Sequence, residues 1–461
     1  MIRRLLLTVC LALPAGAFAD AQPVAEQLRD AALADNAAFE LVSALTTEIG
    51  PRLAGSEADA RAVAWASAQL RALGFDAVWS EAFTLPRWRR GPATAEVLGR
   101  YAQPLAITAL GSSVGTNGPL EAEVVEVADF AALQAIDDDR LRGKIVFVSR
   151  ALARSRDGAD YGKAADARVK GPIEAARRGA AAFLLRSLST SNRRLPHTGN
   201  TRLPTDVTPI PAAALSVPDA EQLQRMLARG PVRLRLDIDA GSAGETVSHN
   251  VIGEIRGRDP DAGIVVIGAH LDSWDLGTGA VDDGAGIAIT MAAGAKIAAL
   301  AQRPRRTIRV IAFGAEEFGL IGAKAYARDN AKLIPLHSIG LESDFGAGRI
   351  YALRAGVSAA ALPEFERMAN VLAPLGIAFE PGKGGPGPDI IPLADAGMPW
   401  AQLAQDGSDY FDLHHTADDT LDKIDPTALD QQVAAYAALA WMLAESDVDY
   451  RPAPPRTRAP E

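Results

Sequence analysis

The sequence predicts an α/β protein in which a mixed, largely parallel sheet is flanked by helices and interrupted by an inserted β-rich domain. Strand-like and helical segments alternate from residue 250 onward, a pattern typical of a parallel sheet. Residues 91–245 have a different texture, because short β-like runs alternate there with loops. The length of 461 residues agrees with two or three domains.

The N-terminus has the pattern of an export signal. Two arginines precede an apolar run, residues 5–13, that is too short to span a bilayer. The small-x-small sequence Ala17-Phe18-Ala19 fits a cleavage site, so we expect residues 1–19 to be a signal peptide. The mature chain would then begin at Asp20 and carry no membrane anchor.

Composition restricts the chemistry. Cys10, inside the predicted signal, is the only cysteine, so we expect neither disulfides nor thiolate ligands in the mature chain. Any metal must then be held by histidines and carboxylates. The absence of disulfides from an exported chain favours a bacterial origin and a periplasmic or secreted location. The net charge of −10 and the lack of a basic stripe argue against a nucleic-acid partner.

The first part of the chain reads as helix. Residues 30–75 predict two helices with a turn at 50–55, where Ser56 is a suitable N-cap and Gly74 a suitable C-terminal stop. In the insert, residues 170–179 predict a helix that leads into a strand at 181–186, and the polar residues 186–209 predict a long exposed loop.

The second part carries the main sheet. Strands are expected at 250–257, 263–270, 306–314 and 336–343, and residues 284–301 form a long apolar helix. A closing helix begins at Asp425-Pro426, an N-cap followed by proline. The main domain therefore comprises residues 20–90 and 246–448, and residues 449–461 are expected to be a disordered tail.

Acidic residues and histidines occur where these strands end. His270, the pair Glu316-Glu317 and Asp344 each follow a strand, and Asp282-Asp283 heads the apolar helix. A fifth segment, at 410–420, carries His414 and His415. Because the carboxyl ends of strands line the crevice of an open α/β sheet, we expect these side chains to meet. Any one feature alone is common in turns and on surfaces; their repetition indicates a site.

Four segments resemble the co-catalytic zinc aminopeptidase superfamily, and within it the carboxypeptidase Q (plasma glutamate carboxypeptidase) family. They are GAHLDSWDLGTGAVDDGAG, AFGAEEFGLIGA, GLESDFG and HHTADD. IGPRLAGS, PRWRRG and the glycine-rich approach to Asp389 are similar to that family as well, and the resemblance covers nearly all of residues 40–445. It implies the zinc aminopeptidase fold and a homodimer.

The resemblance implies two Zn²⁺ ions per chain. His270 and Asp344 would bind one zinc, Glu317 and His415 the other, and Asp282 would bridge both. A carboxylate suits a bridging role because its two oxygens can serve two cations. The resemblance also implies a cis peptide bond between Asp282 and Asp283.

It further implies that Glu316 is the general base and that Asp272 accepts a hydrogen bond from His270. Consecutive strand residues point to opposite faces, so Glu316 and Glu317 share a site only if the chain turns there. The family pattern His-Thr-x-x-Asp selects His415, while His414 stays an alternative ligand or a residue that lines the pocket.

Residues 91–245 resemble a protease-associated domain through LRGKIVFVSR and KGPIEAARRGAAAF. We interpret this domain either as packing alone or as a lid that limits how much chain enters the site. Trp274, Asp275, Asp389 and His414 are candidate substrate-binding residues. Asp275 would sense a substrate ammonium or, as we favour, brace its loop.

The predicted function is hydrolysis of short peptides or dipeptides with free termini. The alternatives are a broad aminopeptidase on longer peptides, an acyl transferase of the glutaminyl-cyclase type, and a non-catalytic protein like the transferrin receptor ectodomain. The complete set of five ligands argues against the last two.

Overall fold

The computed structural model describes residues 16–202 and 206–453. The predicted signal peptide lies largely outside these residues and stays a prediction, as does the tail from residue 454 onward. The first described helix, α1, spans Gly16–Ala32.

A mixed sheet forms the centre of the main domain and confirms the predicted fold class. The strand order is β13-β12-β14-β11-β9-β10-β8, and β10, β9, β11 and β14 run parallel to one another. Antiparallel pairs occur toward both edges, where β8 pairs with β10 and β12 pairs with β14, while the outermost strand β13 is parallel to β12. The strands are β8 (Arg233–Ile255), β9 (Ile264–His270), β10 (Thr307–Phe313), β11 (His337–Glu342), β12 (Ile350–Gly356), β13 (Ala378–Phe379) and β14 (Trp400–Gln405).

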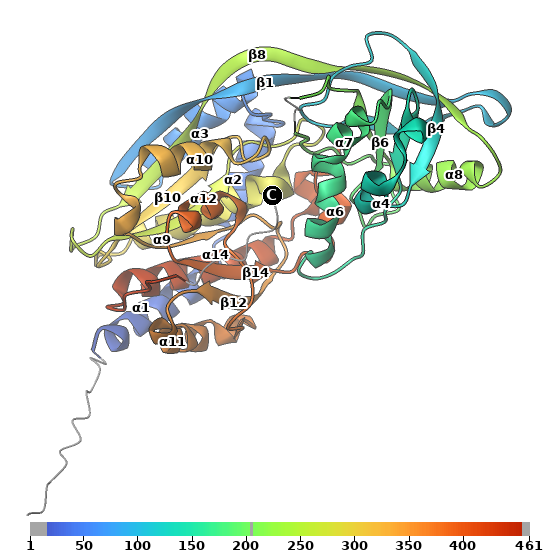
Figure 1. The fold of residues 1–461 in the computed structure, drawn as a ribbon. Coiled ribbons are helices and arrows are strands. Elements are labelled where there is room, and N and C mark those ends of the chain that lie inside the picture. The colour runs from blue at the N-terminus through green and yellow to red at the C-terminus, as the bar shows by residue number, and fades with distance from the viewer. Residues whose placement is uncertain (1–15, 203–205, 454–461) are drawn as a thin grey trace, which may run out of the picture.

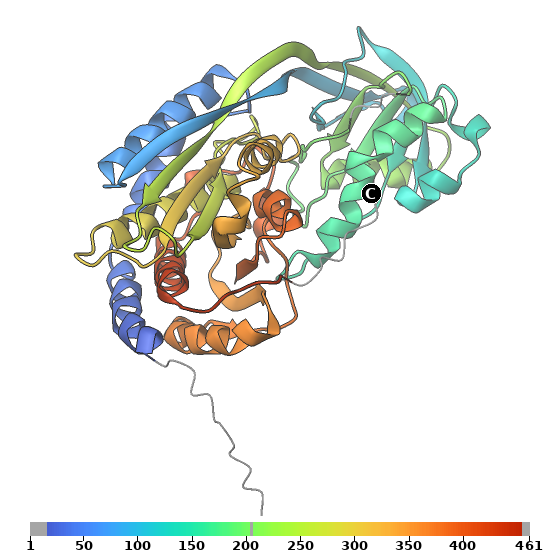
Figure 2. The same cartoon turned by 60° about the vertical axis from the view of Figure 1, so that its left-hand side comes forward.

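Helices cover both faces of this sheet (Figures 1 and 2). Apolar α9 and α14 pack against each other and against α1 and α2, and their side chains are almost entirely buried. Gly286 lets α9 approach the end of β11, since a Cβ there would lie 2.0 Å from the carbonyl oxygen of Ser343. The helices of the main domain are α2 (Ala37–Ala44), α3 (Glu57–Ala72), α9 (Ala285–Ala298), α10 (Ile321–Asp329), α11 (Leu362–Leu372), α12 (Ile391–Asp395), α13 (Tyr410–Leu413) and α14 (Pro426–Glu445).

The predicted caps are confirmed. The Ser56 side chain accepts a hydrogen bond from the Asp59 amide at the start of α3, and Gly74 takes φ = +84° after its end. Asp425 accepts a hydrogen bond from the Thr427 amide at the start of α14. Within the described part of the chain, no helix is both long and apolar enough to cross a membrane.

Two long antiparallel strands connect the main domain to the insert. β1 (Ala77–Val97) pairs with β8 along almost its whole length, with register shifts between Pro86 and Trp88 and between Arg90 and Ala93. In Figure 1 this two-stranded ribbon runs over the top of the molecule from one domain to the other. The predicted boundaries at residues 91 and 245 therefore fall inside continuous strands.

The insert has its own sheet, β4-β5-β6-β7-β3, joined to β8 through β4. Three of its pairings are parallel, and it carries more helix than the β-rich prediction implied. Its strands are β2 (Gln103–Leu105), β3 (Ile107–Ala109), β4 (Leu120–Val127), β5 (Ile145–Val148), β6 (Ala182–Arg186) and β7 (Ala212–Leu215). Its helices are α4 (Phe130–Ala135), α5 (Asp138–Leu141), α6 (Ala159–Val169), α7 (Gly171–Arg177) and α8 (Val217–Leu227).

Two sequence predictions need correction. Residues 186–209 were expected to be an exposed loop, but His197, Thr198 and Thr201 are buried because the loop packs against the segment that carries His415. The tail was expected to begin at residue 449, but Tyr450 is buried and its hydroxyl donates a hydrogen bond to the Leu443 carbonyl.

Candidate metal centre

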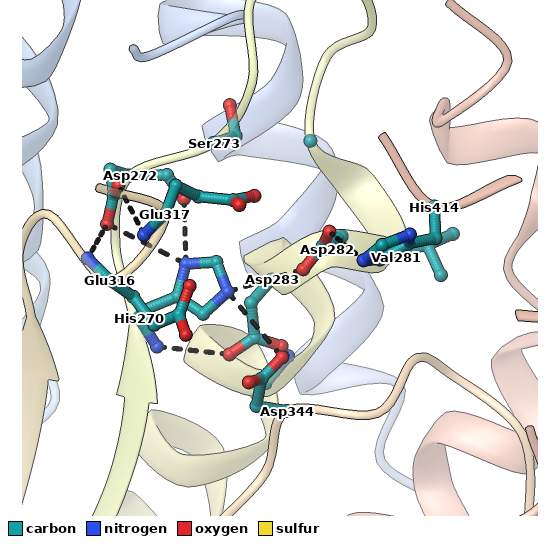
Figure 3. A network of polar contacts seen from close by, with 12 residues as sticks. His270, Asp272, Ser273, Val281, Asp282, Asp283, Glu316, Glu317, Asp344 and His414 are labelled. Carbon is teal, nitrogen blue, oxygen red and sulfur yellow. Dashed lines mark hydrogen bonds and ion pairs between the residues drawn. The ribbon is translucent and has the colours of Figure 1, made fainter. Parts of the chain in front are cut away.

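The five predicted ligands meet at one edge of the sheet, and Figure 3 labels four of them, His270, Asp282, Glu317 and Asp344. His270 ends β9, Glu317 follows β10 and Asp344 follows β11, so three parallel strands deliver side chains to the same edge. Asp282 lies in a short turn, η3 (Ala280–Gly284), before α9, and His415 follows α13.

Asp282 stands at the centre of the cluster. Its Oδ1 atom lies 3.3 Å from Nε2 of His270, and that same nitrogen lies 3.5 Å from Oδ1 of Asp344. The second oxygen of Asp282, Oδ2, lies 3.3 Å from Nε2 of His415. Nε2 of His415 is in turn 3.1 Å from Oε2 of Glu317. One carboxylate thus lies between two pairs of side chains.

His414 is placed differently from His415. The two rings stack with centroids 3.4 Å apart, but Nε2 of His414 is 3.8 Å from Oδ2 of Asp282. The His414 ring lies nearly perpendicular to the ring of Tyr161 in the insert helix α6, with centroids 5.2 Å apart. The geometry therefore favours His415, although His414 also lies within reach of a metal at Asp282.

The chain turns after β10, as a site shared by Glu316 and Glu317 requires. Ala315 takes the left-handed conformation with φ = +55°. The Asp272 carboxylate then accepts hydrogen bonds from the amides of Glu316 and Glu317, at 3.0 and 3.3 Å.

The Asp272 carboxylate thus holds the glutamate turn, and the Asp272 backbone carbonyl holds the His270 ring. Nδ1–H of His270 donates to the backbone carbonyl of Asp272 at 3.0 Å, while the nearest carboxylate oxygen is 3.7 Å away. The predicted hydrogen bond from His270 to Asp272 is therefore made to the backbone carbonyl, while the carboxylate oxygens accept from the two glutamate amides. The carbonyl still fixes Nε2 as the nitrogen that faces Asp282.

The segment around Asp282 is held by two further carboxylates. Asp419 accepts hydrogen bonds from the amides of Val281 and Asp282, at 2.6 and 3.3 Å. Asp283 accepts one from the His270 amide at 3.0 Å. The peptide bond between Asp282 and Asp283 is cis, as predicted.

Burial and proximity shift the acid–base properties of the cluster. Burial alone would lower the pKa of His270, but the nearby carboxylates of Asp272 and Asp282 outweigh it and raise the pKa well above its ordinary value. Burial would raise the pKa of Asp282, but His270 and His415 hold it well below its usual range. Burial raises the pKa of Glu316 well above its ordinary value.

The donor set fits metal ions. Oδ2 of Asp282 and Oε1 of Glu317 are buried and accept no hydrogen bond from the described residues. A buried carboxylate oxygen without a donor is costly, and a cation removes that cost. Histidine and carboxylate ligands without thiolates suit zinc and other first-row divalent metals.

The candidate substrate-binding residues are mostly engaged inside the protein. Trp274 is buried, and its indole N–H donates to Oε2 of Glu317 at 2.5 Å. Asp275 forms an ion pair with Arg90 at 2.8 Å, which agrees with a bracing role. Asp389 is fully buried, and neither of its carboxylate oxygens has a hydrogen-bond partner among the described residues.

Three supporting residues escaped the sequence analysis. Arg52 is fully buried and donates to the carbonyls of Leu271, Thr278 and Gly279, which fixes the loop between His270 and Asp282. Arg90 pairs with Asp275 of the same loop, and the Thr198 carbonyl contacts the His415 ring. Arg52 and Arg90 lie in the quoted segments IGPRLAGS and PRWRRG, but their burial could not be read from those letters.

Residues 250–440 match the model of peptidase family M28. The chain is 34% identical to carboxypeptidase Q of Mus musculus over 414 residues, covering 89% of this chain and 86% of that protein. The human carboxypeptidase Q is also 34% identical, over 416 residues, with 90% and 86% covered. The chain belongs to peptidase family M28.

Solved structures agree with this assignment. The crystal structure of a peptidase M28 precursor from Shewanella amazonensis matches with a TM-score of 0.93 at 47% identity, covering 95% of this chain and all of that one. A zinc aminopeptidase from Bacillus subtilis matches with a TM-score of 0.64 at 22% identity, covering 87% and 93% of the two chains. The second likeness concerns the fold.

Proposed function

We propose that the protein is a zinc-dependent exopeptidase that hydrolyses dipeptides and other short peptides with free termini, and that it uses two Zn²⁺ ions per chain. The observation that carries this proposal is the position of Asp282. Its two oxygens lie 3.3 Å from Nε2 of His270 and 3.3 Å from Nε2 of His415. Family membership and likeness to carboxypeptidase Q support the peptide substrate.

The residues divide into two sets of ligands. His270 and Asp344 would hold one ion, His415 and Glu317 the other, and Asp282 both. When bound, such ions polarise the scissile carbonyl and lower the pKa of bound water. Each ion would keep a free position, as a catalytic site requires.

Glu316 would act on the proton. Glu316 lies in the same turn as Glu317, and its amide donates a hydrogen bond to the Asp272 carboxylate. It is partly exposed, unlike Glu317, which suits a residue that acts on a bound substrate. We assign it the role of base toward the attacking water and of acid toward the leaving amine.

The insert, residues 91–245, is proposed to be a protease-associated domain that restricts access to the site. His414 and Asp389 remain proposed substrate-binding residues, whereas Trp274 and Asp275 are better explained as supports. Export to the periplasm or the medium and assembly into a homodimer complete the proposal.

Metal removal tests it. We expect a chelator to abolish dipeptide hydrolysis and added zinc to restore it. Titration of the metal-free protein should then show two tight Zn²⁺ sites per chain. Full activity at one tightly bound ion per chain would contradict the two-metal assignment, and activity that survives complete metal removal would contradict the metallopeptidase.

A further inference from the structure

Arg90 joins three parts of the molecule next to the candidate metal centre. It lies in β1, and its guanidinium is largely buried. Nε donates to both oxygens of Asp275, at 2.8 and 3.1 Å, in the loop that follows His270. Nη1 donates to Oγ1 of Thr108 at 2.9 Å and also to the Ala109 carbonyl, and Nη2 donates to Oγ1 of Thr198 at 3.0 Å.

Thr198 connects Arg90 to His415. Its carbonyl oxygen lies 3.2 Å from Nδ1 of His415, and its amide donates to the His415 carbonyl at 3.0 Å. The first contact makes Nδ1 the protonated nitrogen and leaves Nε2 free to face Asp282 and Glu317. A residue of the insert thus fixes the ring of a proposed ligand.

Trp274 connects Arg90 to Glu317. The Arg90 guanidinium lies 5.7 Å from the centre of the Trp274 ring and 4.9 Å from that of Trp88, whose edge meets Trp274. Asp275, the ion-pair partner of Arg90, directly follows Trp274. The indole N–H then donates to Oε2 of Glu317.

We propose that Arg90 is a positioning residue for one metal position only, the one between Glu317 and His415. Both side chains of that position are oriented by groups that contact Arg90. The other position is held from within the main domain, because His270 is fixed by Asp272 and Asp283 and contacts Asp344 directly. The insert therefore contributes to the metal centre itself. This inference rests on the proposed two-metal assignment.

Zinc affinity of single-site variants tests the proposal. In the Asp344→Ala variant, only the Glu317–His415 position keeps all its ligands. In the Glu317→Ala variant, only the His270–Asp344 position keeps all its ligands. Arg90→Lys keeps the charge but loses the fork of donors. We expect it to weaken zinc binding roughly 10–100-fold in the Asp344→Ala background, the range typical for partners of metal ligands. In the Glu317→Ala background we expect no change.

A neighbouring residue provides the matched control. Arg89 pairs with Asp239 on the surface, where both side chains are more than half exposed, so Arg89→Lys should leave both affinities unchanged. Thermal unfolding of the metal-free variants shows whether each one folds. If Arg90→Lys does not fold, Asp275→Asn takes its place, and we expect the same selectivity.

The outcomes separate the two proposals. If the unsubstituted protein binds a single zinc, the two-metal assignment fails. If it binds two and Arg90→Lys weakens both positions equally or neither, the role assigned to Arg90 is wrong. A lower melting temperature with unchanged zinc affinities would make Arg90 a structural residue alone.

Discussion

At the scale of residues, the turn after β10 gives two adjacent glutamates different surroundings. Glu317 is buried between the Trp274 indole and the His415 ring, while Glu316 stays partly exposed. The left-handed Ala315 and the Asp272 carboxylate make this possible. Substitution of Glu316 is therefore expected to impair catalysis, whereas substitution of Glu317 is expected to impair metal binding.

Glu316→Gln and Glu317→Gln form a matched pair. Glu316→Gln should keep the full zinc content and lose about 10²–10⁴-fold in kcat, because an amide cannot accept the proton. Glu317→Gln should lose zinc from one position. Metal analysis and steady-state kinetics on the same samples check both. Near-normal turnover of Glu316→Gln would show that another group is the base.

These side chains could be predicted because His and carboxylate residues recur at strand ends, where topology brings them together. The groups that orient them could not be predicted. Thr198 acts through its backbone carbonyl, and no side-chain pattern records that. Arg90 adjoins Arg89 in the sequence, and only the fold buries one and exposes the other.

At the scale of elements, a buried polar chain links α10 to the start of β11. Nδ1–H of His337 donates to the Leu333 carbonyl at 2.8 Å, which leaves Nε2 to accept from the Tyr326 hydroxyl at 2.9 Å. Arg309 donates to the same hydroxyl. Burial lowers the pKa of His337 to about 4.

This histidine should make stability depend on pH. An unfolded histidine titrates near 6.5, so between pH 6.5 and about 4 the unfolded chain binds the extra proton. The free energy of unfolding should therefore fall by about 1.4 kcal/mol per pH unit as the pH drops through that range. Denaturation of metal-free protein between pH 7 and 5 measures the slope.

Two variants isolate the contribution of His337. His337→Asn should flatten the slope by that amount, whatever its effect on stability at neutral pH. His249→Asn, at a partly exposed histidine of β8, is the matched control. An unchanged slope in His337→Asn would assign the pH dependence to other groups.

The elements themselves were predictable to different degrees. The parallel strands β9, β10 and β11 and the helices α9 and α14 were predicted because each is a long apolar run, whereas the parallel strand β14 was not predicted. The 21-residue β1 strand was not, because it is solvated over much of its length and contains Pro86 and Gly91. Its partner β8 lies more than 130 residues away, and pairing at that separation leaves no local signal.

At the scale of the whole molecule, the insert packs beside the candidate metal centre. Arg154 of the insert forms an ion pair with Asp412 at 2.7 Å, and Tyr161 stacks on Phe411 with ring centres 4.5 Å apart. Phe411 and Asp412, the main-domain partners in these contacts, belong to α13, which immediately precedes His414 and His415. The insert therefore contacts the main domain directly beside the segment that carries the two histidines.

Substrate length should follow from this arrangement. We expect dipeptides with free ends to have a higher kcat/KM than decapeptides of the same N-terminal sequence, because charged ends are costly to desolvate without partners. Blocking the amino end should abolish cleavage. A peptide panel of graded length measures the effect. Equal efficiency on dipeptides and decapeptides would favour the broad aminopeptidase.

The ribbon of β1 and β8 limits how the distance between the two domains can change. Away from its two register shifts, side chains along the ribbon alternate faces with a period of two. Removing one residue from each strand would turn its inner side chains outward. Removing two would restore the faces and draw the insert in by about 7 Å. The spacing between the domains can therefore be shortened only in steps of two residues per strand.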